Sequence, residues 1–222
     1  MKLIKYLYLS PGGFSLPYMM GICQFIKEHY NLKNYNYIGA SAGSWLSVYL
    51  ASDMLDTEPL LLNYNELFKD TSLIYKWNNI CPFLINEFSD NIKNTKFVKE
   101  KNILVSISNY DITNKIITNE LVNDYKNLNE LLNLCLISSY IPFLSGRNIP
   151  KRNNLITFDG VFSEPNFNNY NINLKISNDM FGRHFTFSEI LGKNKVNVNE
   201  LLYLGYYDSI QNKEMLDLIF LN

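Results

Sequence analysis

Residues 37–43 (Tyr-Ile-Gly-Ala-Ser-Ala-Gly) constrain the fold of this chain more than any other segment. Their last five residues have the form G-x-S-x-G, in which a serine occupies a sharp turn between a strand and a helix. Small residues beside Ser41 suit such a turn, because larger side chains would collide with its tight backbone. A serine there stands at a helix N-terminus, which favours the negative charge that develops in acyl transfer. The pattern also fits a plain strand–turn–helix joint with a capping serine.

The segments around this turn predict an α/β domain. A buried strand, an amphipathic helix and a second strand are predicted at residues 3–9, 18–29 and 35–38, and a helix follows the Ser41 turn. This order is typical of a parallel sheet flanked by helices. The chain of 222 residues has the length of a single domain. Further strands are predicted at residues 103–108, 116–118, 155–158 and 172–176, and further helices at residues 63–77, 129–139 and 199–220.

Composition narrows the functional classes. The formal net charge of -1 leaves no basic excess to neutralise phosphates, so we expect no nucleic-acid partner. The three cysteines are far apart in apolar segments, which indicates buried thiols in a reducing compartment. The apolar run at the N-terminus is interrupted by Lys5 and is too short to span a bilayer. We therefore predict a cytoplasmic protein, soluble or peripheral to membranes, without a transmembrane segment, metal or cofactor.

A glycine pair, Gly12-Gly13, follows the first predicted strand. Neither G-x-G-x-x-G nor the lysine of a phosphate-binding loop accompanies it, so nucleotide binding is not expected. Adjacent glycines at the end of a strand can turn backbone N–H groups outward with no side chain in the way, and an oxyanion hole requires such donors. The alternative is a simple tight turn.

Five short blocks, in the same order, resemble the patatin-like phospholipase family over most of the chain. They are the Gly12-Gly13 loop, the Ser41 turn, the strand–turn–strand at residues 111–115, the helix end at residues 138–142 and the Asp159-Gly160 pair after a late strand. The resemblance implies a three-layer α/β/α patatin-like fold with a central, mostly parallel sheet and the nucleophile on a strand–turn–helix elbow. It implies one domain over residues 1–222, with the motifs within residues 3–170.

The resemblance also implies a Ser–Asp dyad, with Ser41 as the nucleophile and Asp159 as the base that takes its proton directly. The residues fit this chemistry, because a serine hydroxyl needs a nearby base and a carboxylate at the same edge of the sheet can reach it. The implied activity is hydrolysis of carboxylic esters in membrane or storage lipids, of phospholipase A or lysophospholipase type, through an acyl-enzyme at a lipid surface. The other implied site residues are the oxyanion-hole donors Gly12, Gly13 and Phe14 and the elbow glycines Gly39 and Gly43.

The glycine loop departs from the family pattern at three positions. Pro11 stands where a first glycine is expected, Ser15 replaces a basic residue, and Leu16 replaces a further glycine. Two of the backbone donors are kept, but the positive charge is lost. This change bears on the preference for charged phospholipid head groups more than on ester hydrolysis.

Other interpretations stay open. An α/β-hydrolase with a Ser41–Asp159–His184 triad has the right chain order, but the glycine loop only one βα unit before Ser41 disfavours it. A non-catalytic lipid-binding relative fits the altered loop but has no need of both a nucleophile and a base. The Asp159-Gly160 pair alone would also suit a β-turn, and the apolar run at residues 80–85 would suit either core or a wall beside a lipid site. The oligomeric state and the lipid class are left open.

Overall fold

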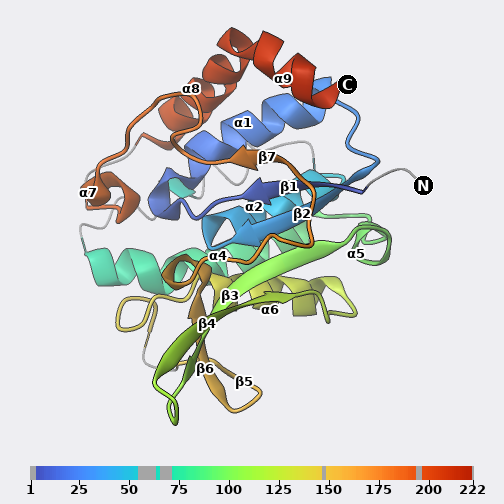
Figure 1. The fold of residues 1–222 in the computed structure, drawn as a ribbon. Coiled ribbons are helices and arrows are strands. Elements are labelled where there is room, and N and C mark those ends of the chain that lie inside the picture. The colour runs from blue at the N-terminus through green and yellow to red at the C-terminus, as the bar shows by residue number, and fades with distance from the viewer. Residues whose placement is uncertain (1–3, 55–63, 66–71, 147–148, 194–196, 222) are drawn as a thin grey trace.

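A mixed sheet forms the centre of the fold in the computed structural model, which describes residues 4–54, 64–65, 72–146, 149–193 and 197–221 (Figure 1). Strands β1, β2, β3 and β7 pair in parallel, while β4, β5 and β6 join by antiparallel pairing. The predicted α/β class with a mostly parallel central sheet is confirmed. The strands are β1 (Lys5–Leu9), β2 (Tyr35–Ala40), β3 (Ile103–Asp111), β4 (Ile116–Val122), β5 (Lys151–Arg152), β6 (Leu155–Asp159) and β7 (Ile172–Ile176).

The long strand β3 pairs with three other strands, β2, β4 and β6. Strand β4 pairs along residues 105–111 of one edge of β3. Strands β2 and β6 share the other edge, where Ala40 pairs with Ser106 and Asp159 pairs with Ile107. Because β2 runs parallel to β3 and β6 runs antiparallel to it, the C-terminal ends of β2 and β6 meet head to head.

Several helices of the described residues match the predictions, but the two short helices Phe97–Glu100 and Phe187–Ile190 were not predicted. The described helices are α1 (Leu16–His29), α2 (Ala42–Ala51), α4 (Leu73–Asn91), α5 (Phe97–Glu100), α6 (Leu128–Ser138), α7 (Phe187–Ile190), α8 (Val198–Gln211) and α9 (Lys213–Phe220), with 3-10 turns η1 (Gly13–Ser15) and η2 (Gly160–Phe162). The helix predicted at residues 63–77 falls largely outside the described residues, and α4 begins at Leu73. It continues through Pro82, within the apolar run at residues 80–85.

The single helix predicted for residues 199–220 is wrong, because α8 ends at Gln211 and α9 starts at Lys213 in a new direction. The Asp208 carbonyl accepts from both the N–H and the side-chain amide of Asn212, which caps the end of α8. The change of direction buries Leu216 and stacks Phe220 on Tyr30, with ring centroids 4.6 Å apart. Tertiary packing therefore overrides the helical periodicity at this point.

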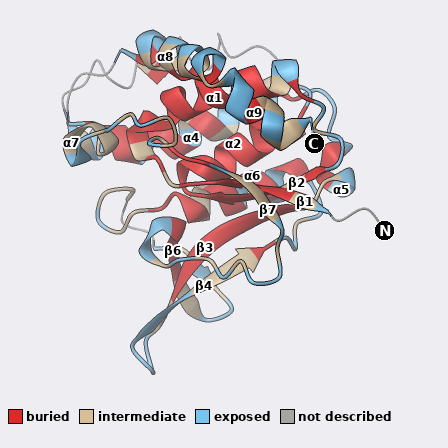
Figure 2. Ribbon diagram, turned by 45° about the horizontal axis from the view of Figure 1, so that its top comes forward, coloured by how far each residue is buried: buried red, intermediate tan, exposed pale blue. Residues whose placement is uncertain are grey.

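Helices cover one face of the sheet, and irregular chain covers the centre of the other. Buried residues of α1, α2, α4 and α6 form one core with the inward side chains of the strands, as the buried ribbon in Figure 2 shows. On the opposite face Tyr6 and Tyr8 pack against Tyr170 and Phe167 of the connection between β6 and β7 (Figure 1). The second helical layer of the predicted three-layer arrangement is thus absent from this face in the described residues.

The length of that connection explains the difference. Strand β7 starts beside Tyr6, so residues 160–171 must return along the sheet and cross two strands, about 20 Å in all. Twelve residues in a helix would rise only about 18 Å and leave none for the turns. An extended path, by contrast, is long enough to span this distance.

Helices α1 and α8 pack closely through two glycines. A Cβ atom on Gly205 of α8 would lie 1.9 Å from the Tyr18 carbonyl oxygen, and one on Gly21 of α1 would lie 2.1 Å from the Leu202 carbonyl oxygen. Any side chain at either position would force the two backbones apart. The α1–α8 contact therefore depends on the absence of side chains at Gly21 and Gly205.

We expect Gly205→Ala to lower the free energy of unfolding by about 1–3 kcal/mol, because overpacking outweighs the higher helix propensity of alanine. Urea denaturation would measure the change. Gln211→Ala, at an exposed position of the same helix, is the control and should be close to neutral. A Gly205→Ala protein as stable as the control would contradict this account of the packing.

Candidate active site

Ser41 lies on a strained turn at the end of β2. Its backbone angles are φ 53 and ψ -125, and α2 begins at the next residue. A non-glycine residue held at positive φ costs on the order of 1–3 kcal/mol, which the surrounding structure must offset. Gly43 permits the turn, since a Cβ there would lie 2.0 Å from the Leu9 carbonyl oxygen at the end of β1. A Cβ on Gly39 would meet the Gly43 carbonyl oxygen at 2.5 Å, so both elbow glycines occupy positions without room for a side chain.

Asp159 accepts a hydrogen bond from this serine. The Ser41 hydroxyl donates to Asp159 Oδ2 over 2.7 Å, although 118 residues separate the two in sequence. The other carboxylate oxygen accepts from the Val161 N–H over 2.8 Å, and the Asp159 N–H donates to the Tyr140 carbonyl. Ser41 is 4% exposed and Asp159 is 1% exposed. The predicted pair is therefore brought together in a site nearly closed to solvent.

The surroundings of Asp159 alter its acidity. Burial disfavours the charged carboxylate and raises its pKa to about 7, while the hydrogen bonds from Ser41 and the Val161 N–H act in the opposite direction. A general base works best when its pKa lies near the working pH. Asp159 has that property without any neighbouring cation.

Two serines at the end of α6 accept hydrogen bonds from the Ser41 turn and from α2. The Ser41 N–H donates to Ser138 Oγ over 2.8 Å, and the Ser138 hydroxyl donates to the Ser106 carbonyl of β3 over 2.7 Å. The Trp45 indole N–H donates to Ser139 Oγ over 2.9 Å. This helix end was predicted as a motif from the sequence, but its contact with Ser41 was not. The signal available was the pair of small hydroxyl residues just before Pro142.

The glycine loop lies directly against the elbow. A Cβ on Gly12 would be 3.6 Å from the Ala42 Cβ, and Gly13 has φ 51. The N–H groups of Gly12 and Gly13 meet no acceptor within the described part of the chain. Ser15, which stands where the family has a basic residue, donates its N–H and its hydroxyl to the Gly12 carbonyl. Ser15 therefore shapes the loop even though it supplies no charge.

A small apolar cavity lies beside Ser41. Its open volume is about 20 Å³, room for about one water molecule. Ile80, Cys81 and Leu84, from the apolar run at residues 80–85, are buried and also line this cavity, so the run serves as both core and wall. The remaining lining includes Gly13, Phe14, Leu16, Trp45, Tyr64, Trp77 and Ser139.

Neither of the two histidines joins the pair. His184 is exposed in the loop before α7, next to Arg183, which binds Asp208. His29 Nδ1 lies 2.9 Å from the Phe25 carbonyl in the last turn of α1. Within the described residues both Asp159 oxygens are occupied by Ser41 and Val161, which leaves the carboxylate without a histidine partner.

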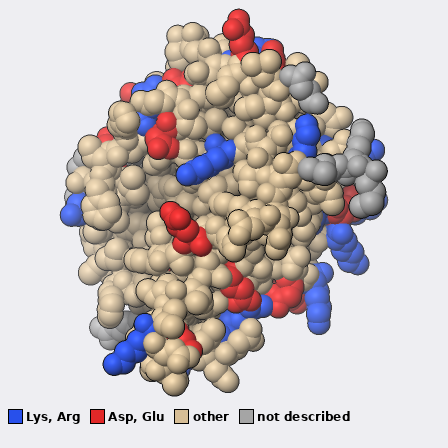
Figure 3. Space-filling model, viewed as in Figure 1, with Lys and Arg blue, Asp and Glu red and all other residues tan. Residues whose placement is uncertain are grey.

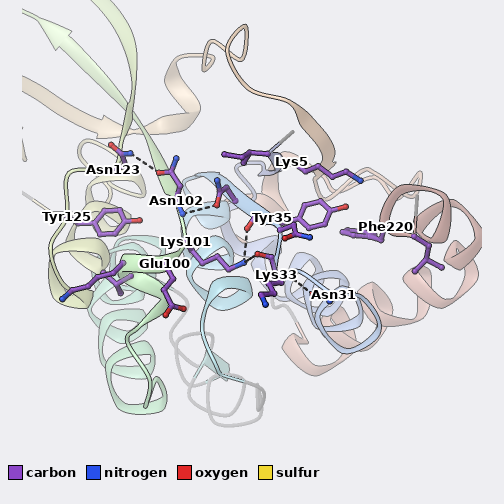
Figure 4. A pocket seen from close by; sticks show the side chains of 16 residues that line it. Lys5, Asn31, Lys33, Tyr35, Glu100, Lys101, Asn102, Asn123, Tyr125 and Phe220 are labelled. Carbon is purple, nitrogen blue, oxygen red and sulfur yellow. Dashed lines mark hydrogen bonds between the residues drawn. The ribbon is translucent and has the colours of Figure 1, made fainter. Parts of the chain in front are cut away.

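A larger hollow of about 970 Å³ lies at the opposite edge of the sheet, where β1 and β2 begin (Figure 4). Lys101 stands in it, and its ammonium group donates to the carbonyls of Leu32, Lys33 and Tyr35. These hydrogen bonds link loops, and no described nucleophile is paired with a base in this hollow. The candidate catalytic groups therefore lie at the edge of the sheet where Ser41 is found.

Comparisons with known proteins do not assign a family: a scan of family models finds no match, and a search of curated proteins finds none. In the described segments no group of three or more His, Cys, Asp or Glu side chains is placed to hold a metal ion. No described helix has both the length and the apolar character needed to cross a bilayer. The patatin-like resemblance stays a prediction that rests on the motif residues and their geometry.

Ser138→Ala would leave the buried Ser41 N–H without its acceptor. We expect the free energy of unfolding to fall by about 1–3 kcal/mol and Ser41 to react more slowly with a fluorophosphonate. Ser47→Ala is the matched control, because Ser47 is equally buried but its hydroxyl only adds a bond to the Gly43 carbonyl. Equal effects of the two substitutions, in urea denaturation and in labelling rate, would argue against a special role for Ser138.

Proposed function

We propose that this protein is a patatin-like serine hydrolase that cleaves carboxylic esters of lipids through a Ser41–Asp159 dyad. The observation that carries the proposal is the 2.7 Å hydrogen bond from the Ser41 hydroxyl to a buried carboxylate on a strained strand–turn–helix elbow. A plain capping serine would have no need of a buried base, because its hydroxyl would serve the helix N-terminus. Instead, Ser41 makes no side-chain capping bond to α2.

The reaction follows from these contacts. Asp159 takes the hydroxyl proton as Ser41 Oγ attacks the ester carbonyl carbon, and the carbonyl oxygen gains the negative charge. The N–H groups of Gly12 and Gly13 are the donors proposed to bind this oxyanion. Collapse breaks the bond to the alcohol, which leaves with the proton from Asp159. Water then attacks the acyl-enzyme, gives a proton to Asp159, and releases the acid; Ser41 recovers that proton.

The lining of the cavity supports an acyl substrate. Phe14, Trp77 and Leu84 present apolar surface beside Ser41, which favours a hydrocarbon chain over a charged group. A volume of about 20 Å³ holds one water molecule and no acyl chain. Binding of a lipid ester therefore requires side chains of this wall to move. The lost basic residue of the glycine loop agrees with a substrate whose acyl chain, rather than its head group, is recognised.

Ser41→Ala should abolish turnover of a short soluble ester and labelling by a fluorophosphonate, because among the described residues Ser41 is the hydroxyl that donates to Asp159. His184→Gln should keep the wild-type rate within about twofold, whereas removal of a triad histidine would cost about a thousandfold or more. Ester release and gel labelling would measure both. A wild-type protein that does not label at Ser41 in its folded state would overturn the proposal in favour of a lipid-binding module.

Turnover should depend on pH through Asp159. Its folded pKa is raised to about 7, so the carboxylate that can accept the Ser41 proton is present above that pH and is lost as the pH falls through it. We expect kcat/KM for a soluble ester to fall about tenfold per pH unit below about pH 6. A rate that stays flat from about pH 4 to pH 7 would show that a different group is the base.

A further inference from the structure

Four exposed apolar side chains stand around the elements that line the Ser41 cavity. We call them the mouth residues: Ile74 and Tyr75 on α4, Phe143 after α6, and Phe187 on α7. Phe143 is 90% exposed and Phe187 is 72% exposed. Ile74 and Tyr75 are 57% and 46% exposed. Side chains of this size and exposure are costly in water when they gather at one place, and such places mark interaction sites.

Contacts in the structure tie these positions to the active site. The Trp77 indole N–H donates to the Leu191 carbonyl over 3.2 Å, which joins the start of α4 to the end of α7, and Trp77 also lines the cavity. A Cβ on Gly13 would lie 2.5 Å from the Ile190 carbonyl oxygen, so α7 sits on the glycine loop. Figure 1 shows α7 and the start of α4 together at the left, where β1 ends.

The turn that carries Phe143 lies close to α4. A Cβ on Gly146 would lie 3.8 Å from Asn78 Oδ1 of α4. The turn begins just after Ser138 and Ser139, which hold the elbow and Trp45. The mouth residues therefore stand on three elements that all touch the site.

The backbone at Phe143 is strained in a way that exposes its ring. Its φ is 70, an uncommon value for a bulky residue. The Ser145 N–H donates to the Ile141 carbonyl, and the Ile141 N–H donates to Ser145 Oγ, so the turn is fixed on both sides. A ring held outward at such a cost points to contact with something outside the molecule.

We propose that the mouth residues seat this protein on a zwitterionic lipid surface by apolar insertion, an inference that rests on the proposed lipid ester substrate. The mouth residues are spread over three elements and form no groove or helix stripe for a partner protein. A lipid surface accommodates such separate side chains and would present the proposed ester substrate next to the elements that line the Ser41 cavity. The inserted side chains would stay near the interface and leave Ser41 facing the lipid.

The charges that the structure describes near the mouth residues favour apolar over electrostatic attachment. Among residues 72–78, 141–146 and 187–193 the charged side chains are Lys76, Glu189 and Lys193. Lys76 is buried and donates to the Gly192 carbonyl, and Glu189 is engaged with Thr186. Figure 3 shows basic and acidic side chains scattered over the view of Figure 1, with no continuous field of one sign. Binding should therefore depend little on salt.

Flotation with phosphatidylcholine vesicles tests the proposal. The double variant Phe143→Ser/Phe187→Ser should bind vesicles about tenfold or more weakly than the wild type, because two large apolar side chains no longer insert. Binding of the wild type should persist in about 1 M salt, where the Debye length is about 3 Å. The matched control is Ile4→Ser/Leu221→Ser, which removes side chains 58% and 70% exposed at the opposite edge of the sheet. It should bind within about twofold of the wild type.

Three outcomes would overturn the proposal: no vesicle binding by the wild type, equal loss in the two double variants, or binding that needs anionic lipid and disappears in salt. Thermal unfolding of each variant checks that it is folded. Ser41→Ala should bind vesicles as the wild type does. Vesicle binding by a wild type that turns over no soluble ester would mean that the proposed chemistry, and not the docking surface, is wrong.

Discussion

The head-to-head meeting of β2 and β6 on one edge of β3 is the constraint on which the site depends. Ala40 and Asp159 pair with the consecutive residues Ser106 and Ile107, so the residue after β2 must meet the last residue of β6. This register brings the hydroxyl and the carboxylate to 2.7 Å deep in the protein. Burial there gives Asp159 a pKa of about 7, because the low dielectric disfavours its charge. The pairing of strands thus sets both the position and the acidity of the Asp159 carboxyl group.

The strain at Ser41 is offset by the same framework. Ser138 links the Ser41 N–H to the Ser106 carbonyl, so the elbow is fastened to the strand that also positions Asp159. On the other side the elbow packs on the end of β1, where a side chain at Gly43 would not fit. A residue held this way cannot relax without disturbing β1, β3 and α6 together, which keeps its hydroxyl directed at the carboxylate.

Local patterns predicted most of the fold, and tertiary distances decided the rest. The strand–turn–helix around Ser41 follows from small residues between two periodic segments, and the predicted strands correspond to described strands. Sequence analysis placed Asp159 at the edge of a parallel sheet, but β6 is antiparallel to β3, and only the register explains the contact. The break at Asn212 and the irregular cover over Tyr6 and Tyr8 depend on packing across the molecule. No local pattern carries that information.

Helix α4 connects the small cavity beside Ser41 to the outer surface. Trp77, Ile80 and Leu84 face the cavity, while Ile74 and Tyr75 stand exposed one turn earlier. Pro82 has no N–H to give to the carbonyl four residues before it, so the helix is least constrained where the wall is formed. The open space beside Ser41 is about 20 Å³, so a group larger than one water molecule would fit there only if that wall shifted. The exposed residues Ile74 and Tyr75 and the residues that limit the space beside Ser41 therefore belong to one helix, α4.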